Sequence, residues 1–199
     1  MIKAILFDAD GVTLEKKGYF SDRFAKDYNL PTELVASFFK EKFDACQRGQ
    51  ADLKQEIQPY LEKWDWQRSV DDFLIYWFAS DFTEEHQILT KIDELRSRGI
   101  KCFLVSNQEK YRATYFKNSR EFSSHFDGFF FSCEIGHLKK EKEFFTEVLK
   151  KLDIPGEEIM YFDNEEKNIK AAAELRIESY IFGSFQNFIK IIKDKNLIN

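Results

Sequence analysis

The stretch ILFDADGVT, at residues 5–13, decides the fold of this chain. Its first residues are apolar and favour a buried β-strand, and two carboxylates, Asp8 and Asp10, follow directly. Open α/β sheets bind ligands outside the carboxyl ends of their strands. Alternate side chains of an extended segment point the same way, so both carboxylates can face one pocket, and Gly11 lets the chain turn away at once. Carboxylates buried this close together need a metal ion or another cation as counter-charge.

Other short apolar runs continue the pattern of this first strand, at residues 100–105, 128–131, 159–162 and 178–182. Each is followed by small or polar residues, as is typical of strands that are buried on both faces. Helical periodicity lies between them, at residues 83–98, 142–152 and 166–175. This alternation predicts an α/β fold, a Rossmann-like and mainly parallel sheet flanked by helices.

Residues 15–82 interrupt the alternation, because they show helical patterns and no clear strand. The expected helices cover residues 21–28, 32–48, 53–64 and 70–79. Their aromatic residues share helix faces, which favours packing inside a helical bundle. We therefore expect two domains: a Rossmann-like core of residues 1–14 and 83–199, and an all-helical cap of residues 15–82 inserted after the first strand, over the mouth of the sheet.

The composition of the chain argues against several classes of protein. Its 199 residues suffice for one sizeable core with a smaller lobe. A net charge of −5, with acids and bases mixed along the chain, argues against a nucleic-acid partner. The three widely spaced cysteines predict neither disulfides nor a cysteine metal site and favour a cytoplasmic location. We also expect no membrane partner, since there is no signal-peptide layout and no run of about 18–20 apolar residues.

The segment around Asp8 resembles the first motif of the haloacid dehalogenase-like (HAD) hydrolase superfamily, apolar residues followed by Asp-x-Asp-Gly-x-Thr. The helical insert after it resembles the cap of the subfamily I type. The resemblance implies that Asp8 is a nucleophile that attacks phosphorus and forms an aspartyl-phosphate. Asp10 would protonate the leaving oxygen and then activate water, and its main-chain carbonyl would ligate Mg²⁺ beside Asp8. An acid at position 10 fits phosphatases and phosphomutases, whereas the dehalogenases of the superfamily lack one there.

Two further pieces follow in the order that this superfamily shows. Ser106 and Asn107 resemble motif II, whose hydroxyl and amide hold the phosphate oxygens of the substrate. Residues 132–139, SCEIGHLK, resemble the run that carries the lysine of motif III. The spacing within that run favours Lys139 over Lys140 as the cation that offsets charge on the nucleophile and the phosphoryl group.

Residues 161–172, YFDNEEKNIKAA, resemble motif IV with one departure. Where many relatives carry a second Asp that coordinates Mg²⁺, this chain has Asn164. An amide can still offer a carbonyl oxygen, but it brings no charge, so we expect weaker Mg²⁺ binding. Alternatively, Asp163 turns inward and takes the ligand role. The predicted metal ligands are therefore Asp8 and Asp10 together with Asn164 or Asp163.

Taken together, these motifs predict a Mg²⁺-dependent phosphatase that acts on a small phosphorylated metabolite, either a sugar phosphate or a nucleotide-like molecule. The expected catalytic residues are Asp8, Asp10 and Lys139. The residues expected to bind the substrate are Ser106, Asn107 and Gly11. Two alternatives stay open: a phosphomutase, and a HAD-fold binding or regulatory protein with weakened catalysis, which the amide at position 164 motivates.

Overall fold

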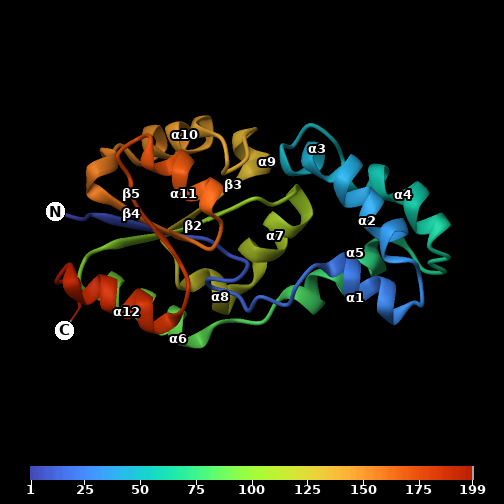
Figure 1. Ribbon diagram of the computed structural model, residues 1–199, viewed down its shortest axis with the longest axis horizontal. Coiled ribbons are helices and arrows are strands. Elements are labelled where there is room, and N and C mark those ends of the chain that lie inside the picture. Colours follow the sequence, from blue (N-terminus) through green and yellow to red (C-terminus); the bar gives the residue numbers. More distant parts are fainter. Residues whose placement is uncertain (199) are drawn as a thin grey trace.

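The centre of the molecule is a sheet of parallel strands in the order β3-β2-β1-β4-β5 (Figure 1). The computed structural model describes residues 1–198, and Asn199, the last residue of the predicted core segment, lies outside them. The strands are β1 (Ala4–Phe7), β2 (Lys101–Ser106), β3 (Gly128–Phe131), β4 (Ile159–Asp163) and β5 (Glu178–Ile181). Every residue of β1 and β4 is buried, as expected of a sheet covered on both faces. The predicted Rossmann-like α/β class is confirmed.

Helices cover both faces of the sheet. They are α6 (His86–Ser97), α7 (Lys110–Asn118), α8 (Arg120–Ser124), α9 (Ser132–Ile135), α10 (Lys142–Leu152), α11 (Glu166–Ala173) and α12 (Phe185–Asp194), with a 3₁₀ turn at Gly156–Glu158. In Figure 1, α10 and α11 lie on one side of the sheet and α6 and α12 on the other. Successive strand residues point to opposite faces, so Phe7 packs with the α6 and α12 side and Leu6 with the α10 and α11 side. Among residues 1–198, no helix has both the length and the apolar character that crossing a membrane requires.

The segment predicted to form a cap contains a second group of helices. They are α1 (Phe20–Asp27), α2 (Thr32–Glu41), α3 (Phe43–Gln47), α4 (Leu53–Lys63) and α5 (Val70–Asp81). Their buried side chains form a hydrophobic cluster of their own, which is rich in aromatic rings. The single helix expected at residues 32–48 is wrong, because helical geometry breaks at Lys42, where φ is −123°. The break lets the Phe43 ring pack against both Phe38 and Phe39, with ring centroids 6.0 and 5.4 Å away.

The two chain segments that connect these helices to the sheet run side by side. The amide of Glu15 donates to the carbonyl of Thr83 (2.8 Å), and the amide of Glu85 donates to the carbonyl of Thr13 (3.0 Å). The predicted domain boundaries, after residue 14 and before residue 83, fall within this paired segment. The division into core and cap stays a prediction, and its two connections leave the sheet next to Asp8 and Asp10.

The loop that follows α3 is in contact with the core. Arg48 Nη1 donates to Glu141 Oε2 (2.7 Å), and the hydrogen bonds and charge of Arg48 lower the pKa of Glu141 to about 2. Gly49 has a φ of +69°, and a Cβ there would lie 2.3 Å from the carbonyl oxygen of Cys133. Only glycine permits this approach. The helical segment is thereby held against the edge of the sheet that carries Asp8.

Candidate active site

Asp8 lies directly after the central strand, between the ends of β2 and β4. The strand register pairs Phe7 with Leu104 on one side and with Phe162 on the other. Asp8 is only 6% exposed, and its Oδ1 accepts a hydrogen bond from the amide of Ala9 (2.7 Å). The hydroxyl of Thr13 donates to the Asp8 carbonyl (3.0 Å) and so fixes the turn after the strand. The fold thus brings a buried carboxylate to the carboxyl edge of the sheet.

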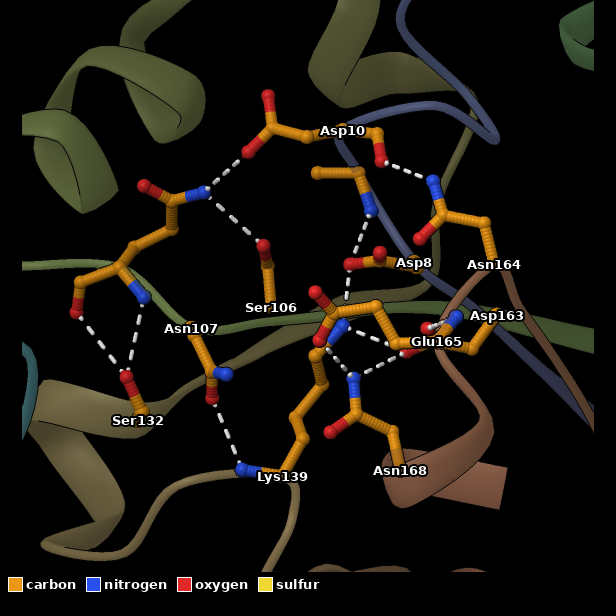
Figure 2. A network of polar contacts seen from close by, with 12 residues as sticks. Asp8, Asp10, Ser106, Asn107, Ser132, Lys139, Asp163, Asn164, Glu165 and Asn168 are labelled. Carbon is orange, nitrogen blue, oxygen red and sulfur yellow. Dashed lines mark hydrogen bonds and ion pairs between the residues drawn. The ribbon is translucent and has the colours of Figure 1, made fainter. Parts of the chain in front are cut away.

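The ammonium group of Lys139 lies between Asp8 and Asp163 (Figure 2). Its Nζ contacts Asp8 Oδ1 and lies 2.7 Å from Asp163 Oδ2. Burial disfavours the charged amine, but the two carboxylates outweigh this effect and raise the pKa of Lys139, so it remains a cation. Lys140 is exposed and pairs instead with Asp44. The structure therefore brings Lys139, and not Lys140, to Asp8.

Both carboxylate oxygens of Asp163 already accept hydrogen bonds. Oδ2 accepts from Lys139, from the Tyr161 hydroxyl and from Asn168 Nδ2 (3.0 Å), and Oδ1 accepts from the amide of Glu165 (2.7 Å). Burial alone would raise the pKa of Asp163, but Lys139 and these donors lower it below its ordinary value. Asp163 is thus an ionised anchor for Lys139 and for the loop that follows β4.

Asp8 is harder to ionise than a solvated Asp. Burial raises its pKa, Lys139 lowers it and the nearby Asp163 raises it again, with a net upward shift. A divalent cation beside the second oxygen of Asp8 would favour the carboxylate, because an opposite charge stabilises the ionised form.

Asn164 lies beside the main-chain carbonyl of Asp10 (Figure 2), to which its Nδ2 donates a hydrogen bond (2.9 Å). A Cβ at position 11 would lie 2.1 Å from that Nδ2, so Gly11 leaves the room that Asn164 occupies. Asp8, the Asp10 carbonyl and the Asn164 amide offer neighbouring oxygen donors, the type that Mg²⁺ prefers, once the amide is rotated by half a turn. No group of three or more His, Cys, Asp or Glu side chains is placed to hold a metal within residues 1–198. Two of the three oxygen donors are of other kinds, a main-chain carbonyl and a side-chain amide.

Ser106 ends β2 on the other side of Asp8, and Asn107 follows it. Ser106 Oγ accepts a hydrogen bond from Gln108 Nε2 (2.9 Å), which leaves the Ser106 hydroxyl proton available to a ligand. Asn107 Oδ1 accepts from the main-chain amide of Lys139 (2.8 Å). In this structure the Asn107 side chain therefore positions the lysine loop at the same edge of the sheet.

Two residues that the sequence analysis missed hold the side chain of Asp10. Arg112 Nη2 donates to Asp10 Oδ1 (2.7 Å) and Nη1 to Oδ2 (3.0 Å), while Gln108 Nε2 donates to Oδ2 (3.1 Å). Burial alone would raise the pKa of Asp10, but Arg112 and Gln108 outweigh it and hold the pKa below its ordinary value. Because Arg112 itself is 8% exposed, this forked pair is largely shielded from solvent on the arginine side.

Arg112 comes from α7, a helix that was not predicted. The sequence nevertheless contains a signal for this helix, because Ala113 and Phe116 have the spacing of a buried helix face. Arg112 lies next to that face. An arginine at the edge of a buried face is uncommon unless a carboxylate or another acceptor pairs with it.

A cavity of about 570 Å³ opens above these side chains, between the sheet and helices α1, α2, α3 and α5. Its volume is within the range of roughly 300–1,000 Å³ that is usual for small-molecule sites. On the side of the sheet it is lined by Asp8, Asp10, Ser106, Asn107, Lys139 and Asn164. On the opposite side it is lined by Phe20, Phe39, Phe43, Asp44, Gln47 and Trp77. The predicted site residues thus share one cavity with side chains of the helical segment, apart from Gly11, which lies behind Asn164, and Asp163, which lies beneath Lys139.

The model of the haloacid dehalogenase-like hydrolase family matches residues 2–176 of this chain. The chain therefore belongs to the haloacid dehalogenase-like hydrolases, which confirms the resemblance seen in the four motifs.

Solved structures of the same family have a similar fold. A predicted HAD-like family hydrolase from Porphyromonas gingivalis is 20% identical, with a TM-score of 0.78 and 100% of both chains covered. A HAD family enzyme from Bacteroides thetaiotaomicron, in complex with magnesium and inorganic phosphate, is 22% identical, with a TM-score of 0.77. The match covers 95% of this chain and 99% of that enzyme's chain. An L-2-haloacid dehalogenase is 18% identical, with a TM-score of 0.66. The match covers 90% of this chain and 83% of the dehalogenase chain. At these identities the likeness shows the fold alone.

We expect the substitution Asn164→Asp to tighten Mg²⁺ binding by roughly tenfold or more, which corresponds to about 1.4 kcal/mol. The reason is that the added carboxylate would supply a charged oxygen beside Asp8 and the Asp10 carbonyl. Calorimetric titration of the purified protein with MgCl₂ measures the change without any assay of activity. Asn118→Asp, at the exposed end of α7, adds the same charge elsewhere and should leave the affinity unchanged. Equal affinities for the wild type and Asn164→Asp would remove Asn164 from the ligand set.

Proposed function

We propose that this protein is a Mg²⁺-dependent phosphatase of the cytoplasm that hydrolyses a small phosphate monoester through a phosphorylated Asp8. The observation that carries this proposal is the contact of the buried Lys139 with Asp8, with Ser106 at the end of the neighbouring strand. A nucleophilic carboxylate, a fixed cation and a hydroxyl donor are what phosphoryl transfer requires of a protein. The substrate would be a small phosphorylated metabolite, a sugar phosphate or a nucleotide-like molecule.

In the first half of the reaction, Lys139 and Ser106 would bind the non-transferring oxygens of the phosphate and hold phosphorus in line with Asp8. A bond then forms between an Asp8 oxygen and phosphorus as the bond from phosphorus to the leaving oxygen breaks. Asp10 would deliver a proton to that oxygen, so the organic product leaves as an alcohol. The product that remains on the protein is an aspartyl-phosphate.

In the second half, Asp10 would accept a proton from a water molecule that attacks phosphorus, which releases inorganic phosphate and restores Asp8. The low pKa that Arg112 imposes on Asp10 favours the deprotonated form that this half requires, and it opposes the protonated form that the first half requires. Mg²⁺ held by Asp8, the Asp10 carbonyl and Asn164 would supply positive charge against the phosphate oxygens.

A second candidate function rests on Asn164. An amide at this position removes one negative charge from the proposed metal site, and here its nitrogen faces the Asp10 carbonyl. A HAD-fold protein with weakened catalysis, which binds a phosphorylated ligand and turns it over slowly, would have such a site. The two candidates differ in turnover at saturating Mg²⁺, and the assay below separates them.

Hydrolysis of an aryl phosphate should require both the metal and Asp8. We expect release of the phenol with Mg²⁺, loss of activity on addition of EDTA, and a fall in kcat of about a thousandfold or more in Asp8→Asn. Asp8→Asn keeps the shape of the side chain, so thermal unfolding should show that the variant remains folded. Asp22→Asn, at an exposed position of α1, is the matched control and should retain full activity.

Activity that survives in Asp8→Asn would contradict the assignment of the nucleophile. A folded wild type that stays inactive with saturating Mg²⁺, both on the aryl phosphate and on a panel of sugar phosphates and nucleotides, would favour the binding function instead.

Arg112 should act as a positioning residue for Asp10. In Arg112→Met we expect kcat/KM for an alkyl phosphate to fall by about tenfold or more, because Asp10 loses the forked pair that orients its carboxyl group. This loss would be part of the roughly 10²–10⁴-fold acceleration that general acid catalysis supplies. For p-nitrophenyl phosphate, whose leaving group needs no proton, kcat/KM should change little, because it reports only the steps up to departure of that group. The ratio of the two values is independent of the amount of folded enzyme.

Arg112→Lys should restore the ratio only in part, because an ammonium group cannot form the forked pair. Arg120→Met, at an exposed position of α8, is the control and should leave the ratio unchanged. An equal loss for both substrates in Arg112→Met would show that Arg112 is merely structural.

A further inference from the structure

The cavity has an aromatic wall opposite Asp8, formed by Phe20, Phe39, Phe43 and Trp77. These rings pack on one another: Phe39 and Phe43 lie 5.3 and 5.5 Å from Trp77, and Phe20 stacks on Trp77 at 5.0 Å between centroids. Phe20 and Trp77 are almost fully buried, whereas Phe39 and Phe43 keep part of their surface exposed and line the cavity. The wall is therefore a firmly packed apolar surface that faces the carboxyl edge of the sheet.

Three polar side chains beside this wall already have partners. Trp77 Nε1 donates to Asp81 (3.0 Å), and Gln47 Nε2 donates to the main-chain carbonyl of Asn107 (3.0 Å). Asp44 lies 3.6 Å from Lys140. A bare sugar placed here would press several hydroxyl groups against the rings of Phe39 and Phe43, and each hydroxyl without a partner opposes binding.

The cavity is also much larger than a phosphate group. Its volume of about 570 Å³ leaves space between the phosphate-binding residues Lys139 and Ser106 and the aromatic wall. An organic group attached to a phosphate held by Lys139 and Ser106 would reach this wall. Flat aromatic groups gain most from such a surface, because they can stack on or pack edge-to-face against the rings.

We infer that the cavity takes a phosphate monoester whose organic part carries a planar aromatic ring, and that this ring packs against Phe39 and Phe43. The inference rests on the proposed function for the position of the phosphate, and it selects ring-bearing substrates over bare sugar phosphates. A nucleobase and a simple aryl group share this chemistry, so the test contains both.

Binding to Asp8→Asn, measured by calorimetry with MgCl₂, tests the inference without any turnover. Adenosine 5′-monophosphate and ribose 5-phosphate form a matched pair, because they share the phosphorylated hydroxyl and differ in the base. Benzyl phosphate and cyclohexylmethyl phosphate form a second pair, which differs only in the planarity of the ring. We expect at least one ring-bearing member to bind about tenfold or more tightly than its partner, the size of effect that stacking on aromatic side chains produces. Ribose 5-phosphate bound as tightly as adenosine 5′-monophosphate, with benzyl and cyclohexylmethyl phosphate also equal, would overturn the inference.

The substitutions Phe39→Leu and Phe43→Leu, made in the same background, locate the ring. Each keeps an apolar side chain of similar size and should reduce the preference for the aromatic ligand by roughly threefold to tenfold, with ribose 5-phosphate unchanged. Tyr28→Leu, at an exposed aromatic residue beyond the end of α1 that does not line the cavity, is the control and should have no effect. An unaltered preference in both Phe variants, with thermal unfolding that shows them to be folded, would contradict the assignment of the wall.

These binding results are independent of the proposed phosphatase activity. A preference for ring-bearing ligands in a protein that hydrolyses none of them would reject the phosphatase and retain the ligand class. Hydrolysis that depends on Asp8, combined with equal binding within both pairs, would retain the phosphatase and reject the ligand class.

Discussion

The buried ammonium group of Lys139 is the interaction on which the carboxyl edge of the sheet depends. It contacts Asp8 after β1 and Asp163 at the end of β4, and its main chain is held by Asn107 after β2. The loop that follows α9 is in this way fixed to the ends of three strands. Removing one partner of a buried ion pair typically costs about 3–5 kcal/mol, because the other charge is left without compensation. The same contacts that stabilise this edge therefore also place the proposed nucleophile.

When Asp8 is ionised, the charges of these paired side chains leave one negative charge in excess. Asp8 and Asp163 face the single positive charge of Lys139, while Asp10 is paired with Arg112. A divalent cation bound beside Asp8 would reverse the sign, and the site would then suit a phosphate dianion. On this balance, the metal would bind before the substrate. The uncharged amide of Asn164, in place of a carboxylate, would then mainly weaken the binding of the metal.

The sequence was most informative where polar side chains of the candidate site directly follow an expected strand. The runs that precede Asp8, Ser106 and Asp163 were visible as strands, and parallel packing then brings their carboxyl ends together. Arg112 and Gln108 were missed, because the helix after β2 was not predicted and because their partner, Asp10, is about a hundred residues away in the chain. The choice between Asp163 and Asn164 as the metal ligand stays a prediction, and the coordinates add only that both carboxylate oxygens of Asp163 already accept hydrogen bonds.

The helical segment was the least predictable part of the site. Its aromatic residues were interpreted as bundle packing, which holds for most of them, yet Phe39 and Phe43 also line the cavity. Periodicity identifies the buried face of a helix, but it cannot separate a ring that completes a core from one that also borders a ligand site. The break at Lys42, which turns Phe43 toward Phe39, had no sequence signal that we recognised.

The most direct test of the central proposal is to look for the phosphoryl group on the protein. The wild type would be mixed with an aryl phosphate and Mg²⁺, quenched in acid within the first turnovers, digested and examined by mass spectrometry. We expect phosphate on the peptide that contains Asp8, released by hydroxylamine as an acyl phosphate should be, and no label in Asp8→Asn. Steady turnover with no label at Asp8, or with the label on another residue, would contradict the proposal.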